Sequence, residues 1–96
     1  MFDLDSRLLN IFYHIYKSKS VSMAADAIGV SQPTISNGLV KIRQHFDDPL
    51  FLRVGNEMIL TELAKQIFPL VSEVINKVES INNFSLHFEP SKSDID

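Results

Sequence analysis

The chain has 96 residues, of which 45% are hydrophobic and 22% charged, with no cysteine and a formal net charge of −3. One modest hydrophobic core fits this length, and a helical domain of this size gains stability by pairing with a second copy. The lack of cysteine excludes a disulfide framework and a thiolate metal site. No run approaches the roughly 18 apolar residues of a membrane span, and no signal peptide is visible, so we expect a cytoplasmic protein.

The negative net charge is unevenly spread along the chain. Residues 6–46 carry five Lys or Arg side chains against one Asp, whereas residues 47–96 carry four cations against nine acids. Phosphate contacts act over about a Debye length, roughly 8–10 Å, so the local charge matters more than the total. The N-terminal half is therefore basic enough to contact nucleic acid, although with modest non-specific affinity.

A first helix is predicted over residues 3–17 because apolar side chains recur there at helical spacing. We expect this apolar face to support the core, and Arg7 on the same element to touch a phosphate backbone. The histidines do not have the short spacing of metal ligands, so no metal site is expected. The apolar residues are Leu4, Leu8, Ile11, Phe12 and Ile15, and the histidines are His14, His45 and His87.

Two short helix patterns separated by a glycine follow in residues 20–53, SVSMAADAIGVSQPTISNGLVKIRQHFDDPLFLR. Ser22 is expected to cap the first helix, and Gly29 to form the left-handed turn that ends it. Ser31 is expected to cap the second helix, where Pro33 is tolerated in the first turn. Small residues mark close packing in the first helix, and an apolar stripe marks the buried side of the second: Ala24 and Ala25, then Ile35, Leu39, Ile42 and Phe46. The pattern is a helix-turn-helix.

The side chains off the stripe at the start of the second helix are short, uncharged and able to hydrogen-bond: Gln32, Thr34, Ser36 and Asn37. Base edges in a major groove require such groups. Gly38 is a local conflict, since it costs about 1 kcal/mol relative to Ala inside a helix. Neutral drift, a packed neighbour and a close approach to DNA all remain open as its reason.

A small hairpin and a long helix complete the pattern. Asp47, Asp48 and Pro49 stop the second helix, and two β-prone runs, 50–54 and 58–60, are joined by a Gly55 turn. Thr61 is expected to cap the last helix, and Pro69 to kink it. One face of that helix follows heptad spacing, and a second apolar face carries Leu63, Phe68, Leu70 and Ile75. Either the heptad face pairs with a second chain while the other docks on its own domain, or both belong to one thick core.

The segments AADAIGVSQPTIS and DPLFLR, with Thr61 at the matching distance, resemble the N-terminal domain of LysR-type transcriptional regulators over residues 3–84, nearest the branch of the nodulation regulators. The resemblance implies a mainly α fold. A winged helix-turn-helix of three helices and a two-stranded wing occupies residues 1–60, and a linker or dimerisation helix occupies residues 61–84. Residues 85–96 are then a flexible tail that opens the linker to an absent effector-binding domain.

Site residues follow from this pattern and this resemblance. The base-reading set is Gln32, Pro33, Thr34, Ser36 and Asn37. The set for the DNA backbone or minor groove is Ser22, Ser31, Lys41, Arg43 and Arg53, in which Arg53 carries the minor-groove contact that the resemblance implies. Arg43 has an alternative role as an internal brace of the domain. The dimer set is Ala64, Ile67, Val71, Val74, Val78 and Ile81.

The function expected is that of a bacterial regulator that binds an interrupted palindrome in double-stranded DNA as a homodimer. A tetramer is expected only of a full-length chain, and a small-molecule effector only on the absent domain. The alternative is a helix-turn-helix module for protein–protein interaction or dimerisation without DNA binding, which the charge of −3 supports. No arrangement of nucleophile, base or phosphate loop points to an enzyme, and no cofactor is expected.

Overall fold

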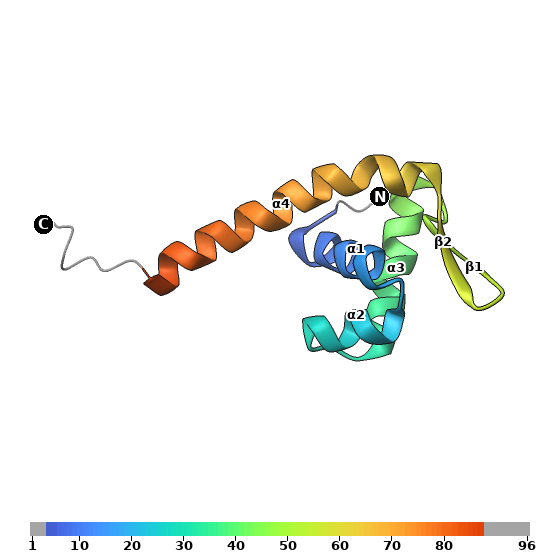
Figure 1. The fold of residues 1–96 in the computed structure, drawn as a ribbon, viewed down its shortest axis with the longest axis horizontal. Helices are drawn as coiled ribbons and strands as arrows, with labels where there is room; N and C mark the ends of the chain where they lie inside the picture. The colour runs from blue at the N-terminus through green and yellow to red at the C-terminus, as the bar shows by residue number, and fades with distance from the viewer. Residues whose placement is uncertain (1–3, 88–96) are drawn as a thin grey trace, which may run out of the picture.

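The computed structural model describes residues 4–87, with side chains to residue 84. The elements are α1 (Ser6–Ser18), α2 (Val21–Ile28), α3 (Gln32–Phe46), β1 (Phe51–Val54), β2 (Glu57–Leu60) and α4 (Glu62–His87). Figure 1 shows α1, α2 and α3 packed together with the hairpin projecting at one side, while α4 crosses this unit and continues beyond it. The expected winged helix-turn-helix with a long following helix is confirmed.

Side-chain caps fix where the helices begin. The amide of Leu8 donates to the Asp5 carboxylate at 2.9 Å, and this bond starts α1. Ser20 caps α2, since the Met23 amide donates to its hydroxyl at 3.1 Å, so the prediction of Ser22 as the cap was wrong. The Ser20 amide in turn donates to the Ser18 hydroxyl at 3.2 Å, and α2 begins two residues earlier than the sequence pattern indicated. Ser22 lies exposed in the first turn of α2.

The core lies where α1, α2, α3 and the start of α4 meet. Ala24 and Ala25 are buried, as expected of small residues under a packed helix. Gly29 ends α2 with a φ of 85°, a left-handed conformation that favours glycine. The predicted stripe of α3 is buried at Ile35, Leu39 and Ile42, whereas Phe46 is only partly buried.

Gly38 has a packing reason. A Cβ atom placed on it would lie 2.6 Å from Cδ1 of Ile11, so a side chain at this position would force the Ile11 side chain to shift. The close approach supports the packed-neighbour explanation among the three that the sequence left open. The helix accepts the propensity cost of glycine because a larger residue would displace the core side chain Ile11, which is 2% exposed.

We expect Gly38→Ala to lower the free energy of unfolding by about 1 kcal/mol, because the clash with Ile11 exceeds the gain in helix propensity. Ile11→Val removes the clashing atom, so in that background the same change should raise the stability by about 1 kcal/mol. Urea denaturation of the four proteins in this double-mutant cycle measures the coupling. Additive effects would show that the contact with Ile11 does not explain the glycine.

The hairpin pairs β1 and β2 in antiparallel register, with Leu52 opposite Ile59 and Arg53 opposite Met58. Gly55 turns the chain with a φ of 65°. Asp48 links the hairpin to α4, because one of its oxygens accepts from the Leu50 amide and from the Thr61 hydroxyl, both at 2.8 Å. Thr61 caps α4 as predicted, accepting from the Ala64 amide at 3.1 Å.

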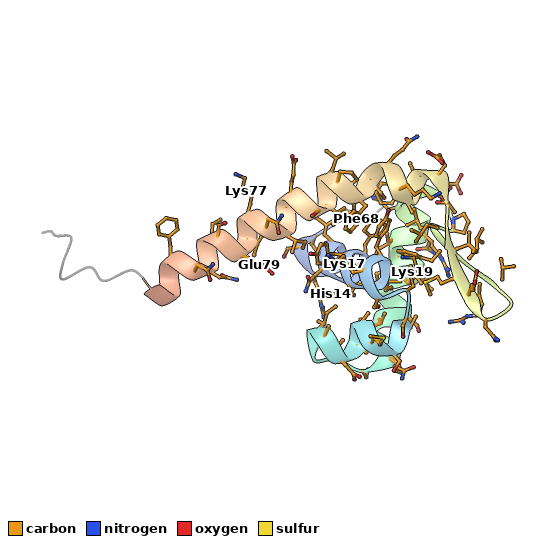
Figure 2. All side chains as sticks on the ribbon, viewed as in Figure 1. His14, Lys17, Lys19, Phe68, Lys77 and Glu79 are labelled. Atoms are coloured by element: carbon orange, nitrogen blue, oxygen red, sulfur yellow. The ribbon has the colours of Figure 1, made fainter. Side chains whose placement is uncertain are left out.

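α4 is held on the domain by its first half. Phe68 stacks on Tyr16 with ring centroids 3.9 Å apart, and lies between α4 and α1 in Figure 2. The helix continues through Pro69 as one element. It extends to His87, past the end predicted at residue 84, and the rest of the predicted tail lies outside the described residues. None of the helices within residues 4–87 is long and apolar enough to cross a bilayer.

Candidate nucleic-acid interface

The outward face of α3 opposes the buried stripe and carries most of the predicted base-reading residues. Gln32, Pro33, Ser36 and Asn37 are all exposed, while Ile35 on the other side is fully buried. Ser31 caps the helix, since the Thr34 amide donates to its hydroxyl at 3.3 Å. The helix start thus presents uncharged donors and acceptors on a rigid support, which is the form that base edges require.

Thr34 differs from the other four predicted base readers. Its side chain is half-buried, and its hydroxyl lies 3.0 Å from the Ser31 hydroxyl. It also lines the groove between α3 and α1 instead of the outermost side of the helix. The structure therefore places Thr34 in the cap of α3, where its hydroxyl is engaged with Ser31.

Val40 is a residue of this face that sequence reasoning missed. It is apolar and 50% exposed. It lies seven positions after Pro33, and residues spaced by three, four and seven share one face of a helix. That spacing was the available signal, because the expected core stripe of α3 leaves position 40 on the outside.

Two cations flank a groove beside α3. The groove has a volume of about 550 Å³ and lies between α1 and α3, with Arg7, Asn37 and Lys41 in its walls. Asp5 also lines it, although its carboxylate accepts the Leu8 amide as a helix cap. Lys41, predicted as a backbone contact, is exposed, and so is Arg7. Both cations therefore lie beside the outward face of α3.

Arg43 is an internal brace. Its Nε donates to the Pro49 carbonyl and its Nη2 to the Phe51 carbonyl, each at 2.7 Å. These bonds tie the end of α3 to the start of the hairpin and use two of the five N–H donors of the guanidinium. The structure thus shows the internal bracing role that the sequence left open, and the phosphate contact predicted for Arg43 stays a prediction.

Arg43→Lys should lower the free energy of unfolding by roughly 1–3 kcal/mol, because an ammonium group cannot reproduce two bonds from one planar fork. Arg7→Lys is the matched control, since Arg7 is exposed and its replacement should change stability by less than about 0.5 kcal/mol. Thermal and urea unfolding measure both. Equal stability of the two variants would contradict the bracing role.

The wing presents two different faces. Arg53 is exposed close to the Gly55 turn, on the hairpin face whose other β1 residue, Phe51, is buried in the core. The opposite face exposes the apolar residues Leu52, Val54 and Ile59. Arg53 is thus a cation at the projecting end of a hairpin that the core holds at its base.

The predicted dimer residues of α4 differ in exposure, and only some of them are accessible to a second chain. Ala64 and Val71 are 0% and 6% exposed because their own domain covers them, so they are not available to a second chain. Ile67 is partly buried. Val74, Val78 and Ile81 are exposed, as are two residues that the prediction did not include in the dimer set, Leu70 and Phe84.

Most of the exposed apolar residues of α4 lie along one line, and Val78, also exposed, lies beside it. A seam at alternating spacings of four and three runs through Leu63, Ile67, Leu70, Val74, Lys77, Ile81 and Phe84. Figure 2 shows Lys77 projecting from the side of α4 opposite Phe68, away from the domain. We call these seven residues the outer seam. Its apolar members include side chains as exposed as Leu70 at 63% and Phe84 at 71%.

The helix order, the polar outer face of α3 and the projecting hairpin that carries Arg53 define a winged helix-turn-helix. A family model described as "Bacterial regulatory helix-turn-helix protein, lysR family" matches residues 6–65. The chain belongs to this family, as its motifs indicated.

Similar proteins are regulators of the same type. The chain is 32% identical over 82 residues to the HTH-type transcriptional regulator PhcA of Ralstonia nicotianae, covering 85% of this chain and 24% of that protein. It is 33% identical over 92 residues to Nodulation protein D 3 of Rhizobium meliloti, covering 95% of this chain and 29% of that protein. The chain therefore spans less than a third of the length of these relatives.

Solved structures share the fold. The probable transcriptional regulator PA0477 from Pseudomonas aeruginosa superposes with a TM-score of 0.76 at 34% identity, over 80% of this chain and 26% of that one. The CbnR_DBD–DNA complex superposes with a TM-score of 0.72 at 18% identity, over 85% of this chain and 94% of that one. The second comparison establishes the shared fold alone.

Proposed function

We propose that the protein is a sequence-specific DNA-binding transcriptional regulator that binds an interrupted palindrome as a homodimer. The observation that carries the proposal is the outward face of α3, where exposed, uncharged hydrogen-bonding side chains stand opposite a fully buried stripe. An α-helix fits the major groove of B-DNA, and such side chains discriminate base edges there. Family membership supports the DNA-binding part of this proposal, and the CbnR_DBD–DNA complex is a case in which another protein with this fold was solved with DNA.

Base reading belongs to Gln32, Ser36 and Asn37, with Pro33 as an apolar contact beside them. An amide side chain pairs with two atoms of adenine, and Gln32 and Asn37 both carry one. Ser22, Ser31 and Lys41 contact the phosphate backbone, and Arg7 joins Lys41 at the groove between α1 and α3. Arg53 enters the minor groove next to the reading helix, where a narrow A·T-rich groove attracts a cation.

A second copy of this chain covers the outer seam of α4. The exposed side chains of this seam form a stripe longer than a soluble monomer ordinarily leaves in water. Pairing fixes two α3 helices at one separation, as two half-sites about 34 Å apart require. A tetramer, an effector-binding domain and its small molecule are proposals for a longer chain, by analogy with relatives of which this chain covers 24% and 29%.

Titration of a duplex under varied salt tests the proposal. The duplex is selected by the protein from a random library, and a scrambled duplex of equal length is the control. We expect tighter binding to the selected duplex by about 10³-fold and a steep loss of affinity with rising salt, because phosphate contacts release counterions. If the protein acted only through protein–protein contacts, no duplex would be enriched and none would bind even at low salt. That outcome would contradict the proposal and favour the protein–protein interaction module.

A further inference from the structure

We propose that Val40 reads the C5-methyl group of a thymine, as a second apolar reader on α3 beside Pro33. This inference rests on the proposed DNA binding and adds a base-pair preference to it. Val40 is 50% exposed on the same helix as the polar readers. The predicted consequence is a preferred thymine at a fixed distance from the base pair that Pro33 contacts.

The geometry places Val40 in line with the readers. Counting from Pro33, the positions i+3, i+4 and i+7 are Ser36, Asn37 and Val40, and each of these side chains is exposed. Such positions form a single face of an α-helix. Seven residues advance the helix by about 10 Å, which corresponds to roughly three base-pair steps. A helix that presents Ser36 and Asn37 to base edges therefore presents Val40 to the same groove, further along it.

The apolar side chain of Val40 limits which group in the major groove it can contact favourably. In the major groove the bases offer hydrogen-bonding atoms and one apolar group, the C5-methyl of thymine. An apolar side chain without donors or acceptors gains nothing from the polar atoms, so its favourable partner is that methyl group. Removing one such group from water corresponds to about a fourfold change in affinity.

Exposed apolar residues are common, so position matters more than exposure. Met23 on α2 is even more exposed, at 60%, but it does not lie on α3. Val40 instead stands between the polar readers and the Lys41 and Gln44 side chains of the next turn.

The test replaces each thymine of the selected duplex, one at a time, by deoxyuridine, which removes the C5-methyl group alone. The wild-type protein should lose about three- to fivefold in affinity at a position that Val40 contacts. Val40→Ala should bind the unmodified duplex more weakly by the same factor and show no further loss at that position. Met23→Ala is the matched control, because it removes an exposed apolar side chain outside α3 and should keep the wild-type uracil profile.

A second arm restores the methyl group. At the same position a C·G pair should weaken wild-type binding, and 5-methylcytosine should recover about fourfold of the loss for the wild type but none for Val40→Ala. Identical uracil profiles for the wild type and Val40→Ala would overturn the inference while leaving DNA binding in place. A wild-type protein that enriches no duplex would overturn the proposed function and this inference with it. Unchanged melting temperature of Val40→Ala confirms that the fold is kept.

Discussion

Val74→Glu should convert the dimer to a monomer and remove most of the affinity for the palindrome. Val74 is 40% exposed at the middle of the outer seam, and pairing would bury it against the second copy. Two carboxylates per dimer would then lose water without a partner, at a cost on the order of several kcal/mol. Since each 1.4 kcal/mol is a factor of ten, the dimer should weaken by roughly 100-fold or more. Sedimentation at tens of micromolar, beside DNA titration, measures both effects.

Variants along α4 separate this effect from a general loss of stability. Asn76→Glu is the control, because Asn76 is exposed but lies off the outer seam, and it should dimerise normally. Lys77→Leu should tighten the dimer, since a charged residue at a seam position costs stability. Val74→Glu should keep the unfolding transition of a folded domain. A wild-type chain that sediments as a monomer, or a Val74→Glu dimer that binds DNA normally, would contradict dimerisation through the outer seam.

Arg53→Ala should weaken binding by about 1–3 kcal/mol, with the larger loss on sites flanked by A·T pairs. Arg53 is exposed at the projecting part of the wing, so its removal leaves the core unchanged. Titrations against duplexes that differ only in A·T or G·C flanks measure the difference. Arg7→Ala is the comparison, because a phosphate contact predicts equal losses on both flanks. Equal losses for Arg53→Ala on the two flanks would remove the minor-groove argument.

The sequence predicted those features that depend on local chemistry. Ser31 and Thr61 cap their helices as expected, because a cap is decided within one turn of chain. The prediction that Ser22 caps α2 was wrong because Ser20 and Ser22 are chemically equivalent as caps. The hydrogen bond between Ser20 and Ser18 favours Ser20. The helix-turn-helix order and the hairpin also follow from spacing and turn residues that the sequence displays.

Contacts between segments far apart in the chain could not be predicted from the sequence. Arg43 looks like a phosphate contact on its helix, and its role depends on where the Pro49 and Phe51 carbonyls fold back. Gly38 depends on the position of Ile11 on another helix. On α4 two apolar faces overlap, so spacing alone could not tell that the domain covers Ala64 and Val71 and leaves Leu70 and Phe84 exposed. Val40 was missed because the search of the outward face considered only polar side chains, although its spacing from Pro33 places it on that face.

Base reading by the outward face of α3 is tested most directly by measuring how its residues affect binding specificity. Affinities of Gln32→Ala and Ser36→Ala are compared with those of the wild type on the selected duplex and on the scrambled duplex. We expect a loss of about 1–3 kcal/mol on the selected duplex and little change on the scrambled one, because base contacts specify and phosphate contacts position. Parallel losses on both duplexes would contradict base reading by this face.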